Sequence, residues 1–548
     1  MGLVLGSVDA TPLEFWIGVC EGQRLQLDDM ISVETKLPDG DTVCYYGVVD
    51  LVRKRYEGAQ FDTDVFRVVA GSLPVEVAYA AHVQVTRIEP EIFVPPHPGD
   101  PAVLVRGEAF ERALSFDRME RKLAIGLTRN GEVVYANLDF LEGTRGAHVS
   151  ISGVSGVATK TSYATFLLYS MFHSDSLGAD AINAKALIFN VKGEELLWLD
   201  RDNARADANV KDEYRRLGLP AGPFRDVGLY APTRAHGATL MPDTGSRQDG
   251  VRPYLWTLRE FARDRLLRFA FPDADDARSQ VSFVVQRVEH RLEQAAQEGS
   301  EDDPSLEISG TRLRRFEDLV ELLDGDALDR MTAGSIAAAT LDAFRRRLNA
   351  ASQRIGHLVR GDDAARSHGI HWRSHQVTVV DIHTLHSAAQ TFVVGVLLKR
   401  MMEDKERQGT TRPLVFVVLD ELNKYAPREG WSPLRDILLD IAERGRSLGI
   451  SLLGAQQTAS EVERRVVGNA SLKVVGRLDA AESQRNEYGF LTRTARQRAT
   501  MLRPGSMIVA QPEISTPLLL RFPFPTWATR QSEAAQQPGR DPFSRVGE

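Results

Sequence analysis

This sequence of 548 residues has few cysteines, no long apolar run and no excess of positive charge. Cys20 and Cys44 stand outside any Cys-x-x-Cys pair, which argues against a zinc site or disulfide framework and predicts two buried thiols in a reducing compartment. The longest apolar stretches, such as 415–419, fall far short of the roughly 20 residues that cross a bilayer. We therefore expect a cytoplasmic protein without a membrane segment.

The charge balance excludes one class of nucleic-acid binder. The sequence has 67 basic and 75 acidic side chains, for a net charge of −8. A protein that coats nucleic acid through bulk charge would be basic, so this class is excluded. A local basic channel remains compatible with the composition, because a polyanion responds to the nearby field.

The hydrophobic pattern divides the chain into parts. Residues 1–106 carry alternating β-type runs and predict a small barrel, with a proline-rich linker at 95–101. In 107–525, apolar runs of strand length alternate with amphipathic stretches, which is typical of an α/β protein with a mainly parallel sheet. A helix-rich region at about 205–372 interrupts this pattern as an insertion, and 526–548 is a polar tail that we expect to be mobile.

The segment GVSGVATKTS, at 153–162, follows an apolar run and opens a predicted helix. A phosphate-binding loop needs small residues so that backbone N–H groups converge on phosphate, a lysine for the β/γ oxygens and a hydroxyl for Mg²⁺. The loop is one residue longer than the usual form, and a threonine replaces its last glycine. A glycine-rich turn that binds nothing is the alternative. The predicted ATP-binding residues are Gly153, Gly156, Thr159, Lys160, Thr161 and Ser162.

A second motif, LVFVVLDELNKY at 414–425, places Asp420 and Glu421 after a buried strand. The carboxyl end of a strand is where an α/β sheet binds its ligand. We predict that Asp420 and Thr161 hold Mg²⁺ and that Glu421 polarises the attacking water. A strand that ends in Asp-Glu is common by chance, so this motif gains weight from the Lys-Thr loop upstream.

Two later segments supply the remaining candidate catalytic groups. Arg444 and Arg446 precede a predicted strand, and either could neutralise the charge that develops on the γ-phosphate. The alternative is a solvated helix end, where arginine meets the helix dipole favourably. Gln456 and Gln457 end the next strand, where a glutamine can position the water or remain an ordinary loop residue.

In this order of motifs the chain resembles the HerA family of hexameric DNA-translocating ATPases, relatives of FtsK, over most of residues 1–525. The resemblance implies a RecA-like P-loop core behind a HAS-type barrel, with ATP and Mg²⁺ as cofactors. ERGRSLGI and AQQTASEV look like the family's arginine and glutamine segments and would make Arg446 and Gln457 the catalytic residues beside Glu421. FNVKGEELLWL is similar to the family's Asp-x-x-Gly-Glu-Tyr strand end.

The sequence also departs from the family pattern. Asn190 stands where the last segment usually has aspartate, and Thr458-Ala459 replaces Arg-Pro. The family has an arginine beside the histidine that precedes the phosphate-loop strand. Here His148 follows Ala147, and Arg145 is the nearest arginine and a further catalytic candidate.

The resemblance implies a homohexamer that translocates double-stranded DNA with a NurA-like nuclease or another effector, in DNA end processing or antiphage defence. The alternative is an ATP-gated scaffold that regulates an effector, with vestigial motor activity. A conjugation-type or secretion-type pump is disfavoured by the lack of a membrane segment. Residues 343–373 hold seven arginines and two aspartates, which suits either a DNA-contacting segment or a solvated helix face.

Overall fold

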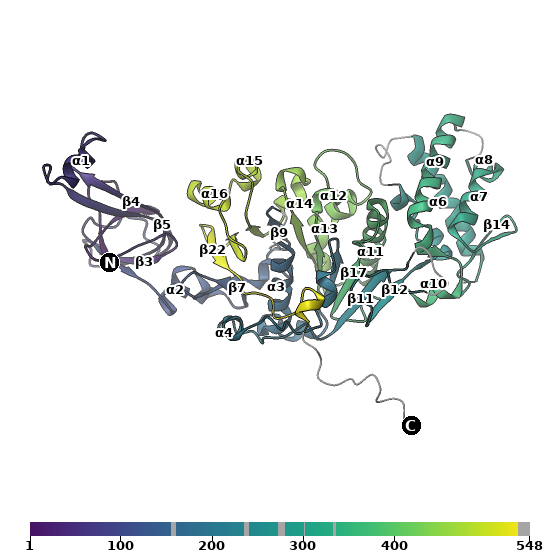
Figure 1. Ribbon diagram of the computed structural model, residues 1–548, viewed down its shortest axis with the longest axis horizontal. Coiled ribbons are helices and arrows are strands. Elements are labelled where there is room, and N and C mark those ends of the chain that lie inside the picture. Colours follow the sequence, from purple (N-terminus) through teal and green to yellow (C-terminus); the bar gives the residue numbers. More distant parts are fainter. Residues whose placement is uncertain (155–159, 235–239, 272–279, 301, 333–335, 535–548) are drawn as a thin grey trace, which may run out of the picture. The chain divides into compact units, whose positions relative to one another are not determined.

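The computed structural model describes residues 1–154, 160–234, 240–271, 280–300, 302–332 and 336–534 (Figure 1). The chain forms two compact units. The first combines Met1–Asn137 with Leu472–Phe522, and the second runs from Leu138 to Ser471 and resumes at Pro523. Within the described residues, no helix is long and apolar enough to cross a membrane.

The first unit begins with a closed six-stranded barrel, which confirms the predicted β-barrel. Its strands alternate buried and outward-facing residues, so that Ile31 and Val33 enter the core while Ser32 does not. Around the barrel the order is β1 (Gly2–Val4), β2 (Glu14–Val19), β5 (Glu76–Glu89), β4 (Thr42–Glu57), β3 (Met30–Lys36) and β6 (Pro101–Leu104). A short helix, α1 (Asp64–Val69), lies between β4 and β5.

The expectation of two buried thiols was wrong. Cys20 is exposed and Cys44 is half-buried. Cys20 comes directly after β2, where the chain leaves the barrel wall. Cys44 lies on β4 between the buried side chains of Val43 and Tyr45, so the period of two places it on the outer face of the wall.

The remainder of the first unit is an antiparallel sheet. MIVAQ forms a strand as predicted, but it pairs antiparallel with both of its neighbours. The strand order is β20 (Leu472–Val475), β21 (Ser506–Ala510), β22 (Leu518–Arg521), β7 (Lys122–Leu127) and β8 (Val133–Asn137). The helices of this region are α2 (Glu108–Ala113), α15 (Ala480–Ser483) and α16 (Arg493–Ala499).

The second unit contains the parallel sheet that the apolar runs predicted. Its strands are almost wholly buried, which explains why they read as continuous apolar runs rather than alternating ones. Their order is β12 (Val251–Tyr254), β11 (Val227–Pro232), β17 (Val377–Asp381), β10 (Lys185–Asn190), β18 (Val415–Leu419), β19 (Ile450–Gln456) and β9 (Val149–Ser152). All of these pairings are parallel, so the strands end at a common carboxyl edge and begin at a common amino edge.

Helices connect these strands, and the return from helix to strand is tight. Before β19 the chain turns at Gly449, whose φ is +69°. A Cβ at this position would lie 1.8 Å from the carbonyl oxygen of Thr411, so only glycine fits. The connecting helices are α3 (Lys160–His173), α4 (Ala208–Arg216), α11 (Ser387–Gln408), α12 (Leu422–Tyr425), α13 (Arg435–Leu448) and α14 (Arg464–Gly468).

The helical insertion forms a subregion of its own beside α11 (Figure 1). β11 and β12 fall within 205–372 but belong to the parallel sheet, so the helix-rich part begins only after them. Its helices are α5 (Leu258–Arg263), α6 (Gln280–Glu298), α7 (Phe316–Asp324), α8 (Asp326–Thr332), α9 (Ala338–Ile355) and α10 (Asp363–Ser367). Its short strands are β13 (Trp256–Thr257), paired with β16 (Val359–Arg360), and β14 (Leu306–Ile308), paired with β15 (Thr311–Leu313).

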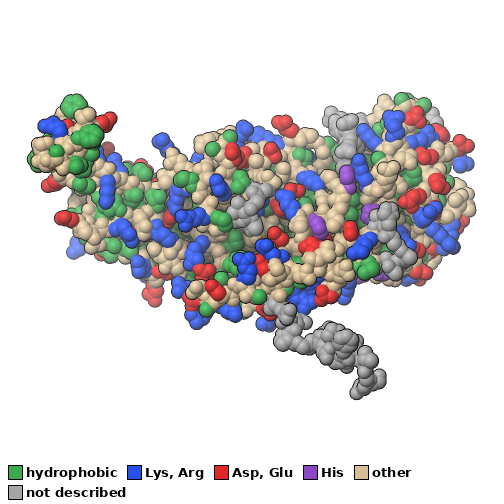
Figure 2. All heavy atoms as spheres, viewed as in Figure 1, with side chains coloured by type: hydrophobic (Ala, Val, Ile, Leu, Met, Phe, Trp, Pro, Cys, Tyr) green, Lys and Arg blue, Asp and Glu red, His purple; other side chains and the backbone are tan. Residues whose placement is uncertain are grey.

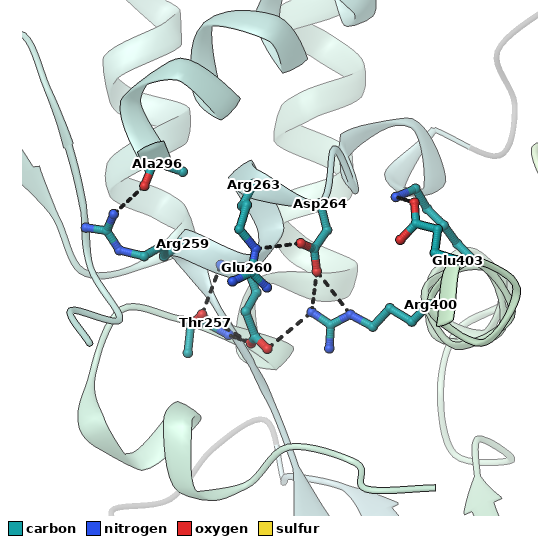
Figure 3. Close-up of polar contacts among 9 residues, drawn as sticks. Thr257, Arg259, Glu260, Arg263, Asp264, Ala296, Arg400 and Glu403 are labelled. Carbon is teal, nitrogen blue, oxygen red and sulfur yellow. Dashed lines mark hydrogen bonds and ion pairs between the residues drawn. The ribbon is translucent and has the colours of Figure 1, made fainter. Parts of the chain in front are cut away.

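An ion-pair network joins the start of the insertion to α11 (Figure 3). The Arg400 guanidinium on α11 donates to Asp264 over 2.8 and 3.1 Å and lies 3.2 Å from Glu260. Arg263 also donates to Asp264, over 2.8 Å. Burial opposes the charge on Asp264, but the two arginines outweigh it and lower the pKa of this carboxyl. These contacts fix α5 against the core helix.

Candidate nucleotide site

Lys160 lies where a phosphate-loop lysine is expected, at the start of α3 and beyond the end of β9. Its side chain is only 6% exposed, and its ammonium donates to the carbonyl oxygen of Gly153 over 2.7 Å. Burial lowers the pKa of Lys160, partly offset by the charge of Asp420. Thr161 and Ser162 follow in the first turn of α3, whereas the predicted residues Gly156 and Thr159 lie outside the described residues.

Thr161 and Asp420 meet across the sheet edge, as the magnesium prediction requires. The Thr161 hydroxyl donates to Asp420 Oδ2 over 3.0 Å, although the residues are 259 positions apart in the sequence. Mg²⁺ in nucleotide sites usually takes one or two protein oxygens and completes its shell with phosphate and water. A hydroxyl and a carboxylate at this distance fit such a site.

Glu421 has an unusual backbone conformation, with a φ of +55°. The Asp420 carboxylate accepts from the Glu421 N–H over 2.8 Å, which helps to hold this left-handed turn before α12. The Glu421 side chain is 25% exposed, and its Oε1 lies 2.6 Å from the Lys192 ammonium. Sequence reasoning missed Lys192 because the contact depends on β10 lying next to β18.

The two glutamines at the end of β19 differ in their surroundings. Gln457, the predicted catalytic glutamine, is exposed just after the strand. Gln456 is fully buried, and its amide donates to the hydroxyls of Ser150 and Ser152 on β9, each over 2.8 Å. Among the described residues the Gln456 Oε1 has no hydrogen-bond donor. Gln456 thus joins two strands of the site, while Gln457 is accessible to a ligand.

The turn after β10 is held by side chains at the same carboxyl edge. The Asn190 amide donates to the Gly193 carbonyl over 2.7 Å and to Asp381 Oδ1 over 2.8 Å. Asp381 is fully buried, which raises its pKa, and its carboxylate also contacts His383 Nδ1 at 2.8 Å. Asparagine therefore serves here as a donor to a carboxylate on the neighbouring strand, a role that aspartate at position 190 would not fill.

Arg145 and Arg446 lie together at the opposite, amino edge of the sheet. Arg446 is in the last turn of α13, before β19, and Arg145 precedes β9. The Arg446 guanidinium donates to the carbonyls of Gly143 and Thr144 over 2.8 and 2.6 Å. Arg444, by contrast, is paired with Asp440 at 3.0 Å and with Glu406 at 2.7 Å. None of the three arginines is at the edge that carries Lys160.

His148 lies at the same amino edge, but unlike the exposed arginines it is buried. It is 4% exposed and has a φ of +69°. Its Nδ1 accepts from the Leu452 N–H over 3.0 Å, so the neutral ring carries its proton on Nε2, facing the Ala442 carbonyl. Burial lowers the pKa of His148 from 6.5 to about 4. The residue links β9, β19 and α13 at the amino edge as a neutral group.

The arginine-rich segment at 343–373 is largely neutralised by ion pairs. Arg360 pairs with Asp362 at 2.6 Å, and Arg345 lies 3.4 Å from Asp329 and 3.3 Å from Asp342. Arg366 and Arg373 have aspartate partners as well. The local excess of positive charge in the sequence therefore corresponds to a surface of mixed sign, which favours the solvated helix over a polyanion track.

Comparison with known protein families and with curated proteins found no match for this sequence. Among solved structures, the bacterial conjugative coupling protein TrwBdeltaN70 in complex with sulphate is 13% identical, with a TM-score of 0.50 over 77% of this chain and 95% of that one. The coupling protein TrwB in complex with ADP and Mg²⁺ has the same identity and coverage and a TM-score of 0.49. VirB4 of Thermoanaerobacter pseudethanolicus is 13% identical, with a TM-score of 0.46 over 74% of this chain and 96% of that one. The likeness to TrwBdeltaN70 confirms the predicted fold class, an α/β, RecA-like P-loop core.

Proposed function

We propose that the chain is an ATP-hydrolysing motor of the HerA type that moves double-stranded DNA as a homohexameric ring. The meeting of Lys160, Thr161 and Asp420 at one sheet edge carries the proposal. A lysine at a helix start, a hydroxyl and a strand-end carboxylate are the groups that a Mg²⁺-bound triphosphate needs. The fold of TrwBdeltaN70 supports the same core architecture.

Within this proposal each group at the carboxyl edge has a defined task. Lys160 would leave the Gly153 carbonyl for the β- and γ-phosphate oxygens, and Thr161 and Asp420 would hold Mg²⁺, which would neutralise phosphate charge when bound. Glu421 orients the attacking water, and the exposed Gln457 contacts the γ-phosphate or that water. Gly153, Gly156, Thr159 and Ser162 complete the ATP-binding segment.

The positions of the arginines favour a site shared between subunits. β19 spans 7 residues, which at roughly 3.3 Å per residue separates its two ends by about 20 Å. An arginine at the amino edge therefore lies far from the phosphate groups bound by its own chain. In a closed ring with head-to-tail contacts, that edge can face the carboxyl edge of the next subunit. We propose that Arg446, assisted by Arg145, neutralises the charge that develops on the γ-phosphate bound by the next subunit.

The barrel is the proposed docking module for a nuclease or another effector protein. Exposed apolar side chains gather around α1, as the space-filling view shows (Figure 2). We call this surface, which contains Phe61, Phe66 and Val69, the tip of the barrel. Phe61, Phe66 and Val69 are 70%, 74% and 80% exposed. Such a cluster on a folded surface is typical of a protein interface. Its proposed partner is a NurA-like nuclease, active in DNA end processing or antiphage defence.

A binding experiment with matched variants tests this docking role. Phe66→Asp should abolish pull-down of a NurA-like nuclease and leave ATP turnover unchanged. Phe93→Asp replaces another exposed phenylalanine of the first unit, 65% exposed and outside the tip, and serves as the control. Loss of binding in both variants, or in neither, would contradict docking at the tip.

The motor proposal itself is tested by ATP turnover with and without duplex DNA. We expect turnover that DNA stimulates in the wild type and no turnover in Lys160→Ala. Lys211→Ala, which removes an exposed lysine on α4, is the matched control. Turnover that ignores DNA would favour the ATP-gated scaffold, and a wild type that binds no nucleotide would overturn both functions.

A further inference from the structure

Lys192 places a second ammonium group in the nucleotide site, on the turn after β10. Its Nζ lies 2.6 Å from Glu421 Oε1. Its charge also reaches Lys160, because after burial it is one of the causes that lower the pKa of that lysine. The side chains of Lys192 and Glu421 are 47% and 25% exposed, so the pair faces solvent at the carboxyl edge.

The backbone that carries Lys192 is held on both sides. Before it, Asn190 is bonded to Asp381 and reaches over the turn to the Gly193 carbonyl. After it, the Glu194 carboxylate accepts from the N–H of Ser246 over 2.8 Å and from the N–H of Gly245. β10 and β18 are adjacent, with Phe189 opposite Leu419, which brings the turn next to Glu421. The fold therefore fixes the backbone position of Lys192 and brings its side chain within reach of Glu421.

We propose that Lys192 is a positioning residue that restrains Glu421 until a nucleoside triphosphate is bound. An ammonium group paired with Glu421 Oε1 draws electron density from the carboxylate and fixes its orientation, so Glu421 is a weaker and less well placed acceptor for a proton from water. The γ-phosphate carries more negative charge than a carboxylate and competes for the same ammonium group. Its arrival releases Glu421 toward the water, whereas a diphosphate leaves the pair closed. The inference rests on the proposed ATPase function.

The proposed release predicts that substitutions of Lys192 and Glu421 have coupled effects on the affinity for a nucleoside triphosphate, and independent effects on the affinity for ADP. In the wild type, an ATP analogue with a non-hydrolysable β–γ bond must break the pair in order to bind. Glu421→Gln removes the competing charge, so it should tighten analogue binding roughly two- to fivefold, the size expected of a partly exposed ion pair. In a Lys192→Gln background the same change should have no effect. ADP binding should be equal in all four proteins.

The experiment is a double-mutant cycle of equilibrium binding, with Mg²⁺ present throughout. Lys192→Arg should restore the coupling, and Lys399→Gln, which breaks the exposed 2.5 Å pair with Glu403 on α11, should leave binding unchanged. Should Lys192→Gln fail to fold, Lys192→Met provides an uncharged side chain of similar length. The proposal would be overturned if Glu421→Gln changed the affinity for the ATP analogue equally with and without Lys192. It would also be overturned if Glu421→Gln changed the affinity for ADP as much as that for the analogue. A wild type that binds neither nucleotide would overturn the proposed function as well.

Discussion

The two edges of the parallel sheet carry different kinds of polar chemistry. At the carboxyl edge, charged groups have side-chain partners: the Asp420 carboxylate accepts from the Thr161 hydroxyl, and Lys192 is paired with Glu421. At the amino edge, Arg446 is held by neutral backbone carbonyls, and the buried His148 is neutral. The first arrangement balances charges that a ligand can rearrange, whereas the second leaves the full charge of Arg446 available to an anion from outside the chain.

Under the proposed function, this difference between the edges is what would allow one sheet to contribute to two nucleotide sites. Because parallel strands place all their carboxyl ends together, one chain can assemble the phosphate and metal groups without help. The same topology removes the arginines at the amino edge from that site. Under the proposed function, a ring joins the two edges of neighbouring subunits, and each prediction below perturbs one edge.

The largest effect is expected at the carboxyl edge, from Lys160→Ala. The variant should lose ATP turnover by roughly 10³-fold or more, because the charge clamp on the transferring phosphoryl group is lost. Turnover by the purified variant, compared with Lys211→Ala, measures the loss. Activity equal to that of the control would mean that 153–162 is not the phosphate loop.

The amino edge is broken by Arg446→Ala. An arginine finger contributes about 10³–10⁵-fold, so turnover should fall within that range while ADP still binds. Arg444→Ala is the matched control on the same helix, because Asp440 and Glu406 already neutralise its charge. If both variants lost ATP turnover equally, the type of partner, carbonyl for Arg446 and carboxylate for Arg444, would not identify the arginine finger.

A smaller loss is expected from Glu421→Gln. The amide preserves the shape of the side chain but polarises water poorly, and general-base catalysis contributes roughly 10²–10⁴-fold. ATP binding should persist, because Lys160, Thr161 and Asp420 remain. Hydrolysis and nucleotide affinity are measured separately, and a variant that no longer binds ATP would assign Glu421 a structural role.

The smallest effect concerns stability at the amino edge. Between pH 6.5 and about 4 the unfolded chain protonates His148, but the folded chain does not. The contribution of neutral His148 to the free energy of unfolding is therefore complete above pH 6.5 and is lost as the pH falls toward 4. At roughly 1.36 kcal/mol per pH unit, the total loss is about 3 kcal/mol. His148→Asn tolerates the positive φ and removes the titration.

Urea unfolding of wild type and His148→Asn across this pH range isolates the histidine from other titrating groups. The wild-type free energy of unfolding should fall more steeply toward low pH than that of the variant. Parallel curves would mean that His148 titrates equally in both states.

The sequence predicted the strand ends better than the contacts between strands. Apolar runs that end in Asp420 or Gln456 are visible locally, because burial on both faces removes the polar alternation. The Lys192–Glu421 pair and the bonds from Gln456 to Ser150 depend on which strands are neighbours, and no local pattern encodes that order. The same limit applied to β11 and β12, two short strands that stand beside a helical insertion in the sequence but extend the sheet in space.

Charge counting also predicted less than the structure shows. The arginines of 343–373 suggested a polyanion surface, yet Arg366 pairs with Asp302 and Arg373 with Asp404, both outside the segment. Ion pairing across helices neutralises a local excess that a sequence window reports as positive. By contrast, the residues alone offered Arg444 and Arg446 equally, and the structure distinguishes them, because the partners of Arg446 are carbonyl groups whereas those of Arg444 are carboxylates.

The most direct test of the two-edge account is complementation between Lys160→Ala and Arg446→Ala. Each variant alone should be inactive, and rings that contain both, verified by mass measurement, should regain part of the ATP turnover. Only the shared site predicts this recovery, because mixed rings contain interfaces that join an intact lysine to an intact arginine. Mixed rings that remain as inactive as either parent would contradict the account and place the catalytic arginine within its own subunit or at another position.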